Sequence, residues 1–122
     1  MSKTILIVDD SNSVRSVVGL TLKGAGYEVI EACDGKDALA KMTGQKIHLI
    51  VSDVNMPNMD GIKFIQEIGK LENYSSTPIC MLTTETEQSK LESNAEISTD
   101  AWITKPVQPA RVIDIVSGIL PP

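Results

Sequence analysis

Five short apolar runs alternate along this chain with stretches that have helical spacing. The runs are TILIV (4–8), YEVIEA (27–32), HLIVS (48–52), ICMLT (79–83) and AWIT (101–104). Short runs rich in β-branched and aromatic residues favour strands. Because strands and helices take turns along the chain, the pattern predicts a parallel sheet wrapped by helices.

The stretches between the runs repeat apolar residues three and four positions apart, which predicts helices with one face on the sheet. We expect the first helix to end at Gly24-Ala25-Gly26, the second to begin at Asp34 and the last to follow Pro109. The stretch from Thr84 opens with a capping box to Glu87 but has few apolar residues, which predicts a weakly packed helix over 84–99. The expected inner faces are Val14, Val17, Val18 and Leu22; Ala38, Leu39 and Met42; Ile62, Ile65, Ile68 and Leu71; and Val112, Ile115, Val116 and Ile119.

The character of the runs also predicts the order of the strands. The runs at 4–8, 48–52 and 79–83 are continuously apolar, as strands buried on both faces are, whereas YEVIEA alternates and AWIT is short. Three central strands and two edge strands fit a flavodoxin-like, doubly wound α/β fold of five βα units with the order 2-1-3-4-5. A length of 122 residues is typical of one domain, so we interpret 1–122 as a single domain.

Composition argues against several classes of partner and location. A net charge of −5 disfavours nucleic acid, because binding to phosphate backbones depends on Lys and Arg. No run approaches the roughly 18 apolar residues of a membrane helix, and the N-terminus does not resemble a secretory signal. We therefore expect a cytoplasmic protein without membrane insertion. Cys33 and Cys80 have no CxxC motif nearby, which predicts two reduced, packed thiols.

Charged and hydroxyl residues follow the runs at one end. Asp9-Asp10 follow the first run, Asp53 follows the third, Thr83-Thr84 close the fourth and Lys105-Pro106 follow the fifth. Parallel strands bring their carboxyl ends to one edge of a sheet, so we expect three carboxylates, a hydroxyl and an ammonium in one cleft. Carboxylates crowded together repel one another by on the order of a few kcal/mol, which predicts a bound cation.

The residue types at this edge favour magnesium and phosphoryl chemistry. Mg²⁺ prefers carboxylate, water and phosphate oxygens, and the predicted edge has neither His nor Cys to favour zinc. An aspartate beside such an ion can accept a phosphoryl group as an aspartyl phosphate. Lys105 and the Thr83 hydroxyl are suited to bind the phosphoryl oxygens.

Each of these residues also has an ordinary explanation when taken singly. The alternatives are a helix N-cap for Asp9 or Asp10, a turn residue for Asp53, a strand end for Thr83, a solvated charge for Lys105 and a core aromatic for Trp102. His48, the single histidine, enters a strand away from this edge and fits a surface or packing residue. The joint occurrence of the others at matched strand ends favours a functional site.

Four segments, IVDDS (7–11), SDVNMPNMDG (52–61), MLTT (81–84) and WITKP (102–106), resemble the receiver domain of two-component response regulators. The resemblance covers essentially the whole chain, which is most similar to the stand-alone, CheY-like regulators of chemotaxis. It implies a phosphorylation-dependent switch that accepts a phosphoryl group from a histidine kinase and signals by binding a protein. Such a switch is not an enzyme, although it assists its own phosphorylation and dephosphorylation.

The resemblance also implies a role for each site residue. Asp53 is the implied phosphoacceptor, and Thr83 and Lys105 would hold its phosphoryl oxygens. The implied Mg²⁺ ligands are Asp10, Asp53 and the Asn55 backbone carbonyl directly, and Asp9 through water.

Further positions of the family pattern concern the conformational switch and the lifetime of the aspartyl phosphate. In the implied switch, the Thr83 hydroxyl moves toward the phosphoryl group and Trp102 turns inward behind it. Asn55 and Glu85 occupy the positions that govern water access to the acyl phosphate, and their types imply rapid self-dephosphorylation. The departures from the family pattern are Trp102 in place of Tyr or Phe, Val107 in place of Phe, and Ile97-Ser98-Thr99 in place of Ala-Gly-Ala. They concern the output surface more than the phosphorylation site.

Other functions are compatible with parts of this pattern. A haloacid-dehalogenase-type phosphatase also uses an Asp nucleophile with Mg²⁺, Thr and Lys, but its DxD motif comes first, and Asp53-Val54-Asn55 lacks the second acid. The intact set of acids, Thr and Lys disfavours a binding module that is independent of phosphorylation. With a single domain, we expect the output to pass through a protein partner, and the resemblance implies the flagellar motor switch or a relay protein. We also expect a monomer. The second partner would make the chain an intermediate of a phosphorelay outside chemotaxis.

Overall fold

A five-stranded parallel sheet with the order β2-β1-β3-β4-β5 forms the centre of the computed structural model, in which residues 3–54, 61–84 and 99–122 are described. The strands are β1 (Thr4–Val8), β2 (Glu28–Ala32), β3 (Leu49–Asp53), β4 (Ile79–Thr83) and β5 (Ala101–Thr104). The predicted strand order is confirmed, and β1, β3 and β4 are the central strands. The register pairs Ile5 with Val29 on one side and with Leu49 on the other.

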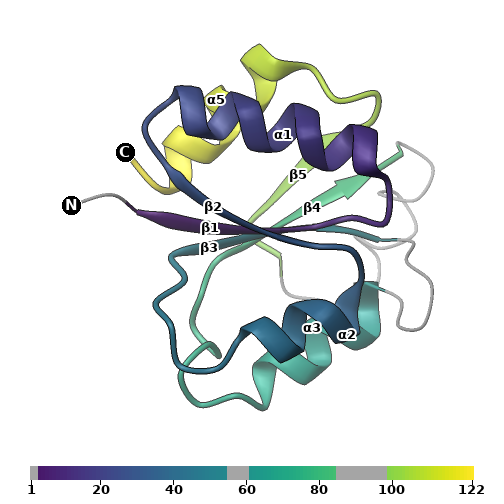
Figure 1. The fold of residues 1–122 in the computed structure, drawn as a ribbon, viewed down its shortest axis with the longest axis vertical. Helices are drawn as coiled ribbons and strands as arrows, with labels where there is room; N and C mark the ends of the chain where they lie inside the picture. The colour runs from purple at the N-terminus through teal and green to yellow at the C-terminus, as the bar shows by residue number, and fades with distance from the viewer. Residues whose placement is uncertain (1–2, 55–60, 85–98) are drawn as a thin grey trace.

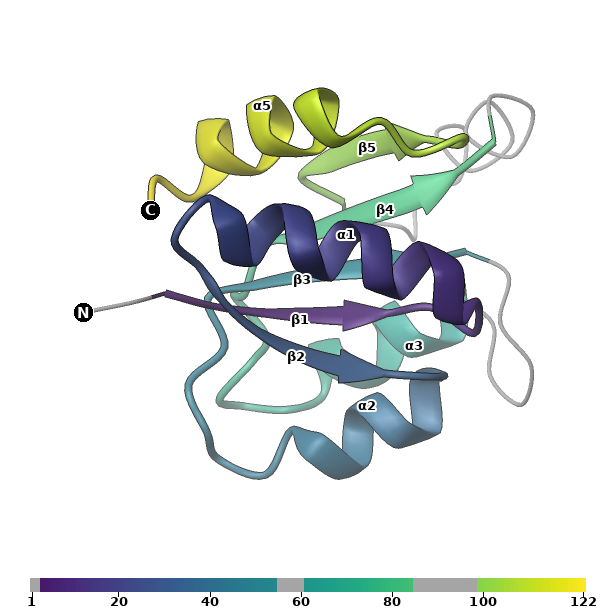
Figure 2. The same ribbon diagram turned by 45° about the horizontal axis from the view of Figure 1, so that its top comes forward.

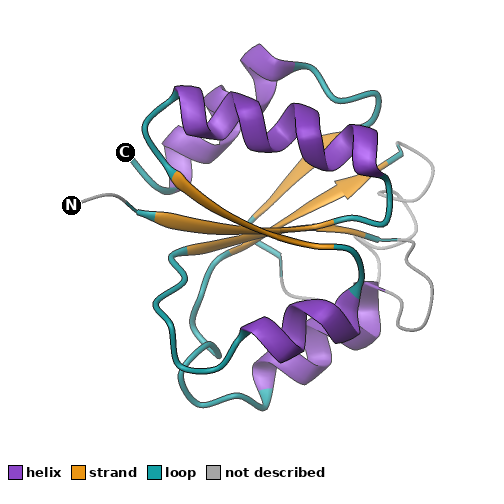
Figure 3. Ribbon diagram, viewed as in Figure 1, coloured by secondary structure: helices purple, strands orange, loops and turns teal. Residues whose placement is uncertain are grey.

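Helices cover both faces of this sheet. Figure 1 and Figure 3 show α1 (Asn12–Gly24) and α5 (Pro109–Ile119) on one face, and α2 (Gly35–Lys41) and α3 (Gly61–Gly69) on the other. The predicted helix over 84–99 falls outside the described residues except at its two ends. Among the helices of the described ranges, none has the length and apolar character needed to cross a membrane.

Local signals set the ends of the helices. Ser11 is the N-cap of α1, and its side chain accepts a hydrogen bond from the Val14 amide at 3.3 Å. Asp34 caps α2 as predicted. Beyond the end of α1, Gly26 has a φ of 102°, a left-handed conformation that glycine adopts without a steric penalty.

Two apolar clusters fill the layers between the sheet and the helices. Alternate strand residues face opposite layers, so that Leu6 of β1 packs in the α2 and α3 layer and Ile7 packs in the α1 and α5 layer. The helix residues buried in these clusters are Val18 and Leu22 of α1, Ala38 of α2, Phe64, Ile65 and Ile68 of α3, and Val112 and Val116 of α5. Val17 was predicted on the inner face of α1 but is 41% exposed, because Val14, Val18 and Leu22 already form the inner stripe at four-residue spacing.

The two thiols and the histidine lie in three different environments. Cys80 is buried, and this burial raises the pKa of its thiol to about 12. Cys33 is exposed, so the prediction of two packed thiols is wrong for it; Cys33 follows the edge strand β2 and precedes the cap of α2. His48 is half-buried and accepts a hydrogen bond from the Thr4 amide at the amino end of β1, away from the carboxyl edge, in agreement with the expected surface or packing residue.

Backbone hydrogen bonds extend the sheet beyond the carboxyl ends of its strands. The Asp9 amide donates to the Ala32 carbonyl at 3.1 Å, and the Lys105 amide donates to the Thr83 carbonyl at 2.7 Å. All the strands point the same way, and Figure 2 shows their arrowheads at one side of the molecule. The residues that follow β1 and β5 are therefore held in line at the same edge.

Burial on α1 predicts a clear difference between two leucines of the same helix. Leu22 is fully buried and Leu20 is 71% exposed. Leu22→Ala should lower the free energy of unfolding by about 2–5 kcal/mol, because it leaves a cavity in the core. Leu20→Ala should change it by less than about 0.5 kcal/mol. Urea denaturation measures both values, and equal losses would contradict this assignment of the α1 faces.

Candidate functional site

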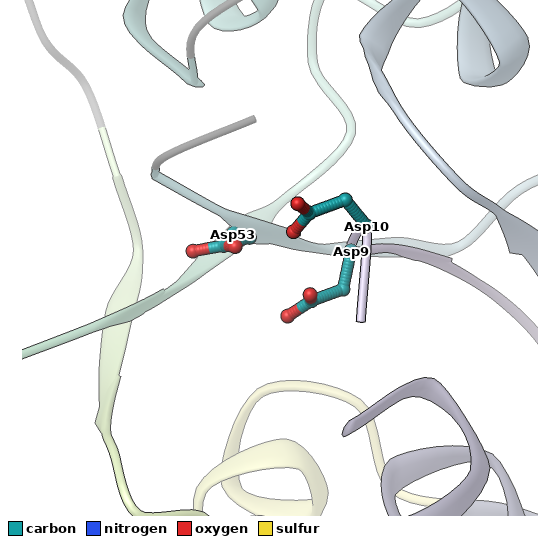
Figure 4. Close-up of side chains that lie close together, drawn as sticks. All are labelled: Asp9, Asp10 and Asp53. Carbon is teal, nitrogen blue, oxygen red and sulfur yellow. The ribbon is translucent and has the colours of Figure 1, made fainter. Parts of the chain in front are cut away.

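The three predicted acids converge at the carboxyl edge of the sheet. Asp9, Asp10 and Asp53 each offer one carboxylate oxygen, and these oxygens lie within 4.8 Å of one another. Figure 4 shows the three side chains gathered where β1 and β3 end. Asp53 is the last residue of β3 and is buried, so the alternative of a turn residue is wrong for it. The N-cap alternative is also wrong for Asp9 and Asp10, since Ser11 caps α1.

Lys105 joins two of these carboxylates. Its Nζ lies 3.1 Å from Asp53 Oδ1 and 3.6 Å from Asp9 Oδ2, and its side chain is 27% exposed. Burial by itself lowers the pKa of Lys105, but the hydrogen bond to Asp53 and the charges of Asp53 and Asp9 outweigh it and raise the pKa. The ammonium is therefore protonated at neutral pH and bound within the site, so the alternative of a solvated charge is wrong.

Asp9 is the buried member of the acidic pair, whereas Asp10 is exposed. The Asp9 Oδ1 atom accepts a hydrogen bond from the Ser11 amide at 2.8 Å. The Oδ2 atom is buried and has no hydrogen-bond partner among the residues that the structure describes. Burial is the main cause that raises the pKa of Asp9; the Ser11 amide opposes the shift, and the charge of Asp53 adds to it. Asp9 thus presents a buried oxygen whose charge is offset, within the described ranges, only by the Lys105 ammonium at 3.6 Å, which favours a further cation.

The donor set fits a hard divalent cation. Three carboxylates within reach of one ion are oxygen ligands of the kind that Mg²⁺ prefers. The single ammonium of Lys105 does not balance their charge, and Asp9 Oδ2 has no hydrogen bond within the described part of the chain. The fourth predicted ligand, the Asn55 carbonyl, lies outside the described residues, as does Glu85.

Thr83 and Trp102 lie on adjacent strands. Thr83 is fully buried at the end of β4, and its hydroxyl donates to the Thr84 carbonyl at 3.2 Å. The register pairs Thr83 with Thr104 and Met81 with Trp102, so Thr83 and Trp102 project from the same face of the sheet. Trp102 is partly buried and packs against the cluster on the α2 and α3 side.

Two residues that support the site were not predicted from the sequence. Ser11 binds Asp9 through its amide and caps α1 through its hydroxyl. A signal for it was present, because Ser directly after the two acids and three positions before Val14 matches an N-cap. Arg15 donates from Nη1 to the Asp9 backbone carbonyl at 2.6 Å, and nothing in the spacing marks this contact.

A family model and curated relatives match nearly the whole chain. A family model described as the response regulator receiver domain matches residues 5–117. The transcriptional regulatory protein PhoP of Bacillus subtilis, which regulates alkaline phosphatase synthesis, is 38% identical over 120 residues, which are 98% of this chain and 49% of PhoP. This chain therefore spans about half the length of the curated relatives it matches.

Solved structures have the same fold over nearly the whole chain. The chemotaxis response regulator CheY4 of Vibrio cholerae has a TM-score of 0.91 and 40% identity, covering 98% of this chain and 100% of that one. The receiver domain of the sensor histidine kinase PA1611 from Pseudomonas aeruginosa has a TM-score of 0.86 and 27% identity, covering 98% of both chains. In that structure a magnesium ion is coordinated in the active-site cleft.

Magnesium should stabilise the folded protein through the three acids. At a Mg²⁺ concentration about 100 times the dissociation constant, the free energy of unfolding should rise by about 2.7 kcal/mol. Asp10→Asn should lose most of this gain, because it replaces a carboxylate of the cluster with a neutral amide. Asp114→Asn, which changes an exposed acid on α5, is the control and should keep the full gain. Thermal unfolding with and without Mg²⁺ measures the effect, and an equal gain in both variants would contradict the site.

Proposed function

This chain belongs to the family of response regulator receiver domains, and on that premise we propose that it is a signalling switch whose phosphoacceptor is Asp53. Receiver domains are phosphoacceptor signalling domains that take phosphoryl groups from histidine kinases. This membership removes a haloacid-dehalogenase-type phosphatase as an alternative. The observation that carries the proposal is the Lys105 ammonium, 3.1 Å from the Asp53 carboxylate at the end of a buried strand.

Asp53 and Lys105 have different roles in the proposed phosphoryl transfer. A carboxylate oxygen of Asp53 attacks phosphorus, its new bond to phosphorus forms as the bond to the histidine nitrogen of the donor breaks, and the imidazole leaves. Lys105 stabilises the negative charge of the phosphoryl oxygens, and the parallel strands hold both groups in place beforehand. We assign the Mg²⁺ to Asp9, Asp10, Asp53 and the Asn55 carbonyl. When bound, Mg²⁺ would neutralise further charge on the phosphoryl oxygens.

Thr83 and Trp102 form the proposed switch. To reach a phosphoryl oxygen, the Thr83 hydroxyl gives up its bond to the Thr84 carbonyl, a net loss of about 0.5–1.5 kcal/mol. A hydrogen bond to a charged phosphoryl oxygen contributes about 1.5–3 kcal/mol, so the new position is favoured after phosphorylation. Trp102 shares the face of the sheet with Thr83 and is only partly buried, which supports an inward turn. Asn55 and Glu85 complete the proposal as the residues that make the aspartyl phosphate short-lived.

The output in this proposal is a protein contact, with chemotaxis as its setting. Similarity to CheY4 over the whole of that chain supports the flagellar motor switch as the target of a cytoplasmic, monomeric regulator. PhoP, a transcriptional regulatory protein about twice as long, supports the second candidate, a receiver in a pathway outside chemotaxis that hands its signal to a relay protein or another module.

Phosphorylation of Asp53 gives a defined change of mass. Acetyl phosphate with Mg²⁺ should add one phosphoryl group to the intact protein, with acetate as the leaving group. Asp53→Asn should add none, because the amide is not a nucleophile, while the control Asp114→Asn should behave like the unchanged protein. Intact-protein mass spectrometry makes the measurement. A phosphoryl group that persists on the Asp53→Asn variant would contradict the assignment.

Binding of the output partner should depend on the phosphorylated state. Beryllofluoride with Mg²⁺ imitates a phosphoryl group on a carboxylate, so it should increase the affinity for the target at least several-fold. Purified flagellar motor switch protein and a purified phosphotransfer relay protein are the two targets to compare by calorimetry. Asp53→Asn under the same conditions is the control and should show no increase. If neither target responds to beryllofluoride, a switch of this kind is wrong.

A further inference from the structure

Arg15 on α1 contacts three different residues near the acidic cluster. Its Nη1 donates to the Asp9 backbone carbonyl at 2.6 Å, and its Nη2 donates to Asn12 Oδ1. Its Nε lies 3.5 Å from Glu31 Oε1 on β2. The side chain is only 15% exposed, so this guanidinium is part of the packed structure and not a mobile surface group. None of these contacts is with the phosphoacceptor itself.

The contacts of Asp9 show what Arg15 holds. The Asp9 amide donates to Ala32 on β2, its Oδ1 atom accepts from the Ser11 amide, and its carbonyl accepts from Arg15. Strand β2 thus supports Asp9 twice, directly through Ala32 and indirectly through Glu31 and Arg15. The carbonyl of Asp9 begins the peptide unit that leads into Asp10. A group that fixes this carbonyl therefore fixes how the two neighbouring carboxylates are aimed.

We propose that Arg15 is a positioning residue of the magnesium site, which sets the turn of Asp9-Asp10 before the ion binds. The inference rests on the proposed function, since it takes the three acids as ligands. Mg²⁺ requires near-ideal octahedral geometry, so a turn that is already ordered binds it more tightly than one that must be ordered on binding. Arg15 supplies this order through a planar fork that reaches the carbonyl, Asn12 and Glu31 at once.

The direction of the change in Mg²⁺ affinity on removal of Arg15 distinguishes a positioning role from a purely electrostatic effect. Arg15 carries a positive charge next to the Asp9 backbone carbonyl, so by electrostatics alone its removal would not weaken the binding of a cation. If Arg15 instead positions the turn, its removal weakens binding in spite of the lost repulsion. A loss of general stability would leave the affinity of the folded protein for Mg²⁺ unchanged.

The test measures the affinity of the full chain for Mg²⁺ alone by isothermal titration calorimetry. Arg15→Gln should bind roughly tenfold more weakly, the lower end of the losses found when a residue that supports a metal ligand is removed. Arg15→Lys should recover part of the affinity, because its single ammonium can reach the carbonyl but not all three partners. The matched control is Lys41→Gln. Lys41 donates to the Glu31 carbonyl at 2.6 Å and pairs with Asp37, and its contacts within the described part of the chain do not include Asp9, so the variant should bind like the unchanged protein.

A second readout does not require the ion. In the metal-free protein, amide exchange at Ser11 should be faster in Arg15→Gln, while exchange at Ile7 within β1 should be unchanged. Equal or tighter Mg²⁺ binding by Arg15→Gln would overturn the inference about Arg15 and leave the proposed function standing. If the unchanged protein binds no Mg²⁺, the proposed metal site fails, and unchanged exchange at Ser11 then overturns the role of Arg15 as well.

Discussion

Repulsion among Asp9, Asp10 and Asp53 is the constraint on which the site depends. Their oxygens lie within 4.8 Å of one another, and the Lys105 ammonium brings one positive charge against three carboxylates. This excess of negative charge at a largely buried edge is unfavourable for the protein alone and favours the binding of a divalent cation. The parallel sheet makes the arrangement possible, because hydrogen bonds beyond the strand ends hold the acids and the lysine in register.

Much of the fold could be predicted because continuous apolar runs indicate which strands are buried in the sheet. The runs at 4–8, 79–83 and 101–104 match β1, β4 and β5 residue for residue. The continuous or alternating apolar character of all five runs predicted the strand order. The sequence was less informative where one of two neighbouring residues is buried and the other is exposed. Val17 and Val18 are adjacent valines on α1, and only packing against the sheet decides that Val18 is buried. Cys33 lies beside the buried Ala32, yet it is exposed once the chain leaves β2.

In the site, too, the sequence predicted which residues come together, whereas their burial and backbone contacts depend on packing. The positions of Asp9, Asp10, Asp53 and Lys105 followed from the rule that parallel strands end at one edge, and the structure brings all four together. The rule does not tell which of the two adjacent acids is buried. It also misses Arg15, because that residue acts on a backbone carbonyl, and a contact of this kind leaves no pattern of residue types in the sequence.

Chemical mapping of the modified residue tests the central claim most directly. Borohydride reduces an aspartyl phosphate to homoserine, so a protein treated with acetyl phosphate and Mg²⁺ and then reduced keeps a stable mark at the acceptor. Peptide mass spectrometry should find homoserine in place of aspartate at position 53 and nowhere else. Homoserine at position 9 or 10, with position 53 unchanged, would contradict the account, because Asp53, the carboxylate nearer to the Lys105 ammonium, would then not be the acceptor.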